Sequence, residues 1–140
     1  MPAKAQLVRT AGKIPTVVAT GRRQSRSAKA RRLRARGVEI LGLPSSKRSL
    51  DLDRLLKELG RWGMTNVIVE GGGWTLGSFV DQGLADEAVI FVSHRLIGGE
   101  QARSALSALG PARIADAIRP AWTKVTRCGE DDVYHLRLAR

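Results

Sequence analysis

The sequence predicts an α/β fold with a mostly parallel sheet that ends in an antiparallel hairpin. Short β-branched runs alternate with Ala-rich or Leu-rich stretches through residues 15–93, an order typical of parallel strands joined by helical crossovers. Two alternating apolar runs then flank the turn GEDD near the C-terminus, which is typical of a hairpin. Because 140 residues suffice for one core and divide poorly into two, we expect a single domain over residues 1–140.

The first elements are two strands and the helix between them. PTVVATG (15–21) and VEILGLP (38–44) are short and bounded by Gly or Pro, which favours buried strands. The stretch SRSAKARRLRARG (25–37) lacks β-branched residues and predicts a helix that Gly37 closes. Since Leu33 offers the main core contact, we expect this helix to be mostly exposed.

SLDLDRLLKELGRWG (49–63) predicts the clearest helix of the chain. Asp51 is placed to cap its N-terminus, and Gly63 lies just beyond its end. The leucines that share one helical face are Leu52, Leu55, Leu56 and Leu59.

The second half of the sequence predicts two further strands with a short helix between them, and then a loop and a closing hairpin. NVIVE (66–70) is apolar on both faces, as expected of a central parallel strand, and EAVIFVS (87–93) predicts another strand. The stretch between them supports a short helix, TLGSFVDQG (75–83). Residues 95–120 predict a loop with one short helix, and WTKVTRC with VYHLRLA predicts the closing hairpin.

The net charge of +11 indicates anionic partners and says little about fold. Eight basic residues and no acid lie between Arg22 and Arg36. A protein that binds nucleic acid often adds aromatic residues to such a patch for stacking on bases, and this patch has none. Three interpretations stay open: a site for phosphate-bearing small molecules, a solvated helix face, and, least favoured, a nucleic-acid surface.

Other classes are disfavoured by composition. No apolar run approaches the ~18 to 20 residues of a membrane span, and the N-terminus lacks the apolar segment of a signal peptide, so we expect a cytoplasmic protein. Cys128 is the only cysteine, which excludes an internal disulfide and predicts a buried thiol. His94 and His135 lack a metal-binding spacing, and we expect no metal.

Three consecutive glycines, Gly71 to Gly73, follow the predicted strand at 66–70 and precede a helix that begins near Trp74 or Thr75. The first amides of a helix have no partner within it, and glycines let an anion approach them closely. The stretch therefore suits a pyrophosphate. It matches neither the GxGxxG fingerprint nor a Walker loop, so a tight turn without a ligand is the alternative.

Glu70 lies at the carboxyl end of that predicted strand, where open α/β sheets place their ligands. A carboxylate among Val and Gly is costly to bury alone. We expect it to meet solvent, a basic side chain or a substrate hydroxyl, and a helix cap or an ion pair is the alternative.

The stretch LDLDRLLKELGRWGMTNV followed by IVEGGGWTLGSFVDQGLADEAVIFVSHRLIGG closely resembles the reductase domain of the bifunctional riboflavin-biosynthesis deaminase-reductase, the RibD C-terminal domain of the dihydrofolate-reductase-like superfamily. The likeness extends through PTVVATG, GVEILGLP and the hairpin, so it covers nearly the whole chain. It implies a three-layer sandwich with helices on both faces of a mostly parallel sheet.

The resemblance also implies a reaction, the NADPH-dependent reduction of the ribose of 5-amino-6-(5-phosphoribosylamino)uracil to a ribityl chain. It assigns Glu70 to the phosphorylated pyrimidine substrate and Thr20 to the adenosine side of the cofactor. From charge and position we expect Arg22 and Arg23 to meet the 2′-phosphate. The remaining cofactor residues that it implies are Gly72, Gly73, Trp74, Thr75, Leu76, Gly77 and Ser78.

The sequence departs from the family in three places. His94-Arg95 stands where the family usually has Pro-Lys, and we expect His94 to lie at the rim rather than to donate a proton. The family's first strand and helix, which carry substrate contacts, and the zinc deaminase half have no counterpart here. We therefore expect NADPH binding without efficient turnover, together with a homodimer. A non-catalytic nucleic-acid-binding module and a related reductase of a pterin-like heterocycle remain as alternatives.

Overall fold

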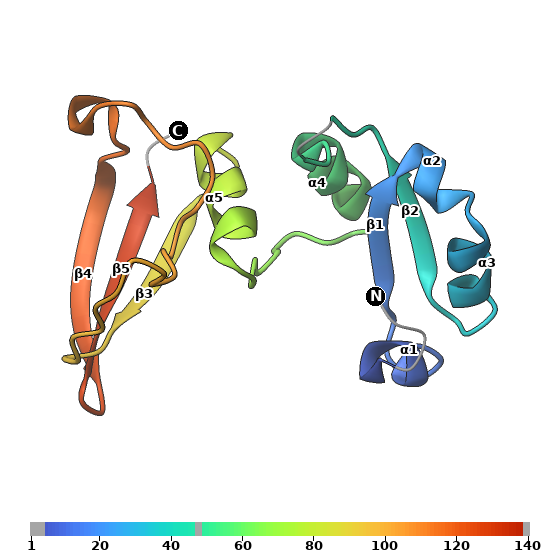
Figure 1. Cartoon of the computed structure of the whole chain (residues 1–140), viewed down its shortest axis with the longest axis horizontal. Coiled ribbons are helices and arrows are strands. Elements are labelled where there is room, and N and C mark those ends of the chain that lie inside the picture. The colour runs from blue at the N-terminus through green and yellow to red at the C-terminus, as the bar shows by residue number, and fades with distance from the viewer. Residues whose placement is uncertain (1–4, 47–48, 139–140) are drawn as a thin grey trace. The chain divides into compact units, whose positions relative to one another are not determined.

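A computed structural model describes residues 5–46 and 49–138 of the chain. It divides into two compact units, Met1–Asn66 and Val67–Arg140, and each unit is described by itself. Figure 1 shows the elements of both. In the described residues no helix is long and apolar enough to cross a membrane. The single domain over residues 1–140 stays a prediction.

The first unit is built on two parallel strands, β1 (Val17–Gly21) and β2 (Glu39–Leu43), paired from Val17 opposite Glu39 to Gly21 opposite Leu43. Both strands were predicted and are confirmed. Helices lie on both sides of the pair, with α2 and α3 on one side and α4 on the other (Figure 1). The helices of this unit are α1 (Gln6–Thr10), α2 (Arg22–Ser25), α3 (Ala28–Arg34) and α4 (Leu52–Arg61).

The helix predicted over residues 25–37 forms as α3, and the short helix α2, which was not predicted, precedes it. Ser27 causes the break between them, because its hydroxyl accepts a hydrogen bond from the amide of Ala30 at 3.2 Å and so caps a new helix. Gly37 closes α3 with a φ of +83°, as predicted. Leu33 is buried and the basic side chains of α3 are exposed, which confirms the lightly anchored helix.

The core of the first unit comes partly from an element that the sequence pattern did not predict. Helix α1 buries Val8, which is only 2% exposed, against Leu33 and Val38. With Ala11 they form the buried cluster of this unit, and Val18 and Ile40 of the strands pack against it. One buried valine on a five-residue helix is too weak a periodic signal to predict a helix.

Helix α4 forms as predicted. The Asp51 carboxylate accepts a hydrogen bond from the amide of Arg54 at 2.8 Å, which satisfies one of the unpaired N-terminal amides. Leu52 is buried and the other three leucines of that face are half-buried. Gly63 follows the helix with a φ of +84°.

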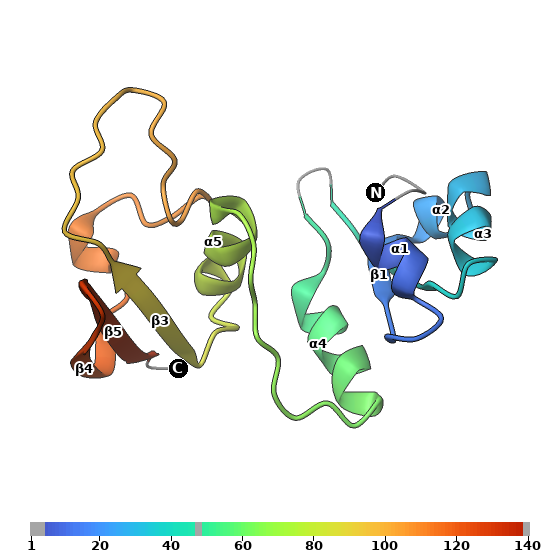
Figure 2. The same cartoon turned by 90° about the horizontal axis from the view of Figure 1, so that it is seen from below.

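The second unit contains an antiparallel sheet in the order β3-β5-β4. The predicted hairpin, β4 with β5, is confirmed, and so is the short helix within the preceding loop. Figure 2 shows that this loop projects away from β3 and returns beside α5. The elements are α5 (Gly73–Asp81), β3 (Glu87–Val92), η1 (Ile114–Asp116), β4 (Pro120–Cys128) and β5 (Asp131–Leu138).

Three predictions about this half are wrong. Residues 66–70 form no strand, and Ile68 is 86% exposed. A strand needs ladder partners, and this segment has none among the described residues. β3 pairs antiparallel with β5, so the described strands form one parallel pair and one antiparallel sheet rather than a single mostly parallel one. The α/β class itself is confirmed. Cys128, expected to be buried, is exposed at the end of β4.

Replacing Asp51 with alanine should lower the free energy of unfolding by about 1 kcal/mol, because the amide of Arg54 loses its acceptor. Urea unfolding followed by circular dichroism measures the change. Asp51→Asn is the matched control, since asparagine also caps helices and should retain most of the stability. Equal stability of Asp51→Ala and the native chain would show that this cap contributes nothing.

Candidate functional site

The N-terminus of α5 lies within the three glycines, Gly71 to Gly73. Gly72 is the N-cap residue, with extended backbone (φ −73°, ψ 163°), and no side chain caps the helix. The Gly72 carbonyl accepts from the amides of Thr75 and Leu76 at 2.9 and 3.2 Å. Amides from Thr75 onward are therefore used inside the helix.

The three amides before Thr75, those of Gly72, Gly73 and Trp74, have no hydrogen-bond acceptor in the described part of the chain. A side chain added at Gly72 would meet no atom within 4 Å, so the space around this residue is open. Unpaired amides at the positive end of a helix dipole attract anions. The first turn of α5 therefore has the chemistry of a phosphate cradle.

The other glycines of the stretch are explained by packing. A Cβ at Gly71 would lie 3.3 Å from the Cβ of Thr75, because the chain turns tightly into the helix at this point. Cβ atoms at Gly73 and Gly77 would meet a returning loop segment, residues 104–108, at 2.5 to 2.8 Å. Close packing was not predicted from the sequence, although the four-residue spacing of Gly73 and Gly77 was its one signal.

The remaining predicted residues of the stretch differ in accessibility. Trp74 and Thr75 are exposed, whereas Leu76 is half-buried. The Ser78 hydroxyl donates to the carbonyl of Trp74 at 2.7 Å, so it is already engaged within α5. Their roles in binding a cofactor stay predictions.

Glu70 is exposed and forms no hydrogen bond or ion pair with the described residues. The alternative that it caps the helix is wrong, because Gly72 occupies the N-cap position. Its carboxylate precedes the open amides by two residues and is available to a ligand hydroxyl. This agrees with the expected role without testing it.

Thr20, Arg22 and Arg23 belong to the first unit, where the turn from β1 into α2 brings them together. Thr20 lies opposite Gly42 in the parallel pair. Gly21 makes the turn close, since a Cβ there would lie 2.6 Å from the Oε1 atom of Gln24. Both arginines are exposed, without an acidic partner among the described residues.

Arg34 is a structural residue within the basic stretch. One of its guanidinium nitrogens donates to the carbonyl of Ser25 at 3.0 Å and the other approaches that of Ile40 at 3.5 Å. It thus ties α3 to the end of α2 and to β2. The basic stretch therefore includes a cation with a structural role, which composition alone does not reveal.

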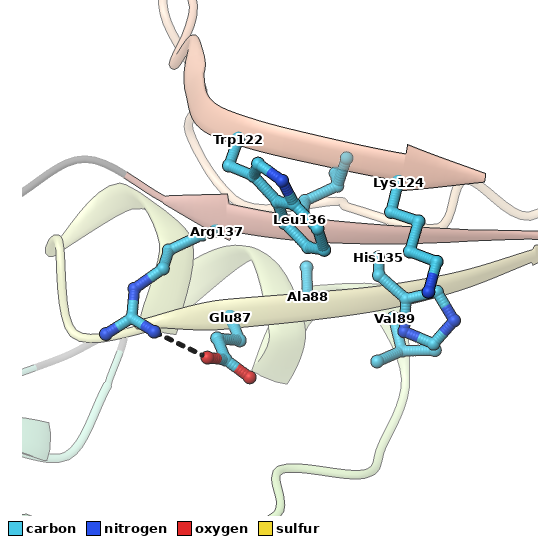
Figure 3. A pocket seen from close by; sticks show the side chains of 8 residues that line it. All are labelled: Glu87, Ala88, Val89, Trp122, Lys124, His135, Leu136 and Arg137. Carbon is cyan, nitrogen blue, oxygen red and sulfur yellow. Dashed lines mark hydrogen bonds and ion pairs between the residues drawn. The ribbon is translucent and has the colours of Figure 1, made fainter.

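A shallow depression of about 580 Å³ lies over the antiparallel sheet. Figure 3 shows Trp122 and Lys124 of β4 above His135 of β5, with Arg137 paired to Glu87 at 3.1 Å. Strand alternation places these side chains on one face, but the sequence does not predict the depression because it depends on the pairing of β3 with β5. No cluster of three metal-ligating residues occurs in residues 5–46 and 49–138.

His94 follows β3, and its side chain is 53% exposed and contacts the start of β5. Its place at the rim of a site stays a prediction. Its Nε2 atom is 3.0 Å from Oδ2 of Asp132, and Arg127 approaches the other carboxylate oxygen at 3.5 Å. The hydrogen bond with His94 is the main cause that lowers the pKa of Asp132 below its ordinary value of 3.8. The family's usual Pro-Lys could not form this imidazole contact.

Removing the imidazole with His94→Ala should raise the pKa of Asp132 toward its ordinary value. A lowered pKa in the folded chain stabilises the fold above the unfolded pKa, and this stabilisation is lost as the pH falls through the folded pKa. Carbon-13 NMR of the Asp132 carboxyl group from about pH 6 to about pH 2 measures the shift. Arg127→Gln should shift it less. An unchanged midpoint in His94→Ala would contradict this prediction.

Comparison with known proteins identifies the family. The model of the RibD C-terminal domain matches residues 1–134. The riboflavin biosynthesis protein RibD of Aquifex aeolicus is 30% identical over 137 residues, which are 98% of this chain and 35% of that protein. RibD of Bacillus amyloliquefaciens is 33% identical over 124 residues, 89% of this chain and 33% of that protein. The chain thus spans about a third of the length of these relatives.

A further relative is named as a reductase. The 2,5-diamino-6-ribosylamino-4(3H)-pyrimidinone 5′-phosphate reductase of Methanothermobacter thermautotrophicus is 33% identical over 84 residues, 60% of this chain and 39% of that protein.

Solved structures agree in fold. Form 1 of Acinetobacter baumannii RibD has a TM-score of 0.76 at 23% identity, and the match covers 100% of this chain and 35% of that chain. A pyrimidine reductase-like protein from Corynebacterium diphtheriae has a TM-score of 0.74 at 15% identity, covering 100% of this chain and 57% of that chain. Together with the match over residues 1–134, these likenesses show that the chain belongs to the RibD C-terminal domain family, which has the dihydrofolate-reductase-like fold.

Proposed function

We propose that this chain binds NADPH and serves in the reduction of the ribose of 5-amino-6-(5-phosphoribosylamino)uracil to the ribityl form. Its family, and the reductase named among its relatives, support this reaction class. The observation that carries the proposal is the set of three unpaired amides at the open N-terminus of α5. They fit a diphosphate, because it is anionic and can reach a backbone that lacks a Cβ at Gly72.

The protein's part in this reaction is binding and orientation. NADPH, when bound, supplies the hydride. The amides of Gly72, Gly73 and Trp74 hold the diphosphate, and the Glu70 carboxylate accepts a hydrogen bond from a substrate hydroxyl. In the first unit, Thr20 contacts the adenosine side and the two exposed guanidinium groups of Arg22 and Arg23 bind the 2′-phosphate.

A cytoplasmic homodimer completes the proposal. Exposed apolar side chains on the antiparallel sheet, including Val89, Phe91 and Trp122, support self-association, since a partner that covers them removes apolar surface from water. The nucleic-acid-binding alternative gains no support from the family match. A pterin-like substrate is distinguished from the pyrimidine by comparing the two in a binding titration.

Gly72→Asp tests the cradle without disturbing the fold. The new side chain enters open space at the N-cap, where aspartate is favoured, so thermal stability should be retained or rise slightly. The carboxylate repels the diphosphate and occupies its amides, and the Kd for NADPH should rise at least about tenfold. Fluorescence titration measures the Kd. Gly72→Asn has nearly the same shape without charge and should bind more tightly than Gly72→Asp. Native affinity in both variants would refute the cradle.

Replacing Arg22 and Arg23 together with glutamine should weaken NADPH binding by about 10- to 100-fold, because two charge-assisted hydrogen bonds are lost. Binding of NADH, which lacks the 2′-phosphate, should hardly change. The matched control replaces Arg31 and Arg32 with glutamine. These arginines are also exposed, and their replacement removes the same charge. If the control lowers NADPH affinity equally, a general electrostatic effect accounts for the loss.

A further inference from the structure

Residues 104–110 of the loop between β3 and β4, which we call the strap, lie along α5 (Figure 2). The amide of Ser107 donates to the carbonyl of Gly73 at 2.9 Å, and the amide of Gly110 donates to Oδ2 of Asp81 at 3.0 Å. These two bonds hold the strap at both ends of the helix. Ala108 is the only residue of 93–119, all of which are described, that is not exposed.

Two glycines on one face of α5 make room for the strap. A Cβ at Gly73 would lie 2.6 Å from the carbonyl oxygen of Ser104, and one at Gly77 would lie 2.8 Å from the backbone nitrogen of Ala108. Contacts this short cannot be relieved without moving the strap. The two residues are four apart and so lie above one another on the helix, which gives a bare strip that accepts the loop backbone.

The strap explains why an acid, Asp81, lies at the end of α5. An acid in the last turn of a helix is disfavoured, since this end of the helix dipole is negative. Its carboxylate accepts from the amide of Gly110, whose φ of +61° lies in the left-handed region. The end of the strap is therefore fixed by a specific pair, an acid on α5 and a glycine in the loop.

We infer that the strap is a positioning element of the diphosphate cradle. It covers the Gly73 side of the first turn of α5, while the Gly72 side stays open. A bound diphosphate must therefore approach from the Gly72 side, and the amides that receive it are held in place by the bond to Ser107. This inference rests on the proposed binding of NADPH.

Asp81 offers a test away from the ligand. It lies eight residues after Gly73, about 12 Å along the helix axis at ~1.5 Å per residue. Asp81→Ala removes the acceptor of Gly110, whereas Asp81→Asn keeps one. In the full chain, Asp81→Ala should raise the Kd for NADPH by about fivefold or more and speed hydrogen exchange of the Ser107 and Gly110 amides. Asp81→Asn should restore both values to near native.

Ala108→Leu provides a second, independent variant. Its larger side chain cannot fit beside Gly77, and it should weaken NADPH binding in the same direction while circular dichroism shows an intact fold. Native NADPH affinity in both Asp81→Ala and Ala108→Leu, despite faster exchange in the strap, would overturn the inference and leave the proposed function standing. A native chain that binds no NADPH would overturn both.

Discussion

The contact between a loop backbone and the first turns of α5 is the constraint on which the second unit depends. The loop from β3 to β4 is almost entirely exposed, and Leu96 and Ile97 are 104% and 86% exposed, so burial of side chains contributes little to holding it. Two backbone donors, at Ser107 and Gly110, fix it to the helix instead. Because backbone bonds of this kind require close approach, the helix must carry glycine where the loop crosses it.

The glycines in residues 71–77 thus have different structural roles. Gly71 permits the tight entry into α5, Gly72 leaves space in front of the unpaired amides, and Gly73 and Gly77 admit the strap. The proposed anion site and the packing site share one helix turn but lie on different sides of it. A substitution at Gly73 that impairs the protein can therefore act by displacing the strap and says little about a ligand. A substitution at Gly72 tests ligand binding directly.

The two units also differ in how their charged residues are paired. In the second unit, some of the described acids have basic partners: Glu87 pairs with Arg137, and Asp132 pairs with His94 and Arg127. Glu70 has none among the described residues, which makes its carboxylate available for a neutral or hydroxyl-bearing ligand. In the first unit the exposed cations outnumber their described acidic neighbours, which suits an anionic ligand and is more informative than the total of +11.

The sequence by itself determined the elements whose signals are local. Asp51 and the leucine spacing define α4, Gly37 ends α3, and GEDD turns the hairpin, because caps and turns act within a few residues. Only the tertiary structure decided the rest: β3 pairs with β5, residues 66–70 remain without a described ladder partner, and the strap occupies Gly73. Each of these depends on a segment far along the chain, and an apolar or glycine-rich run does not by itself specify which segment will pair with it or pack against it.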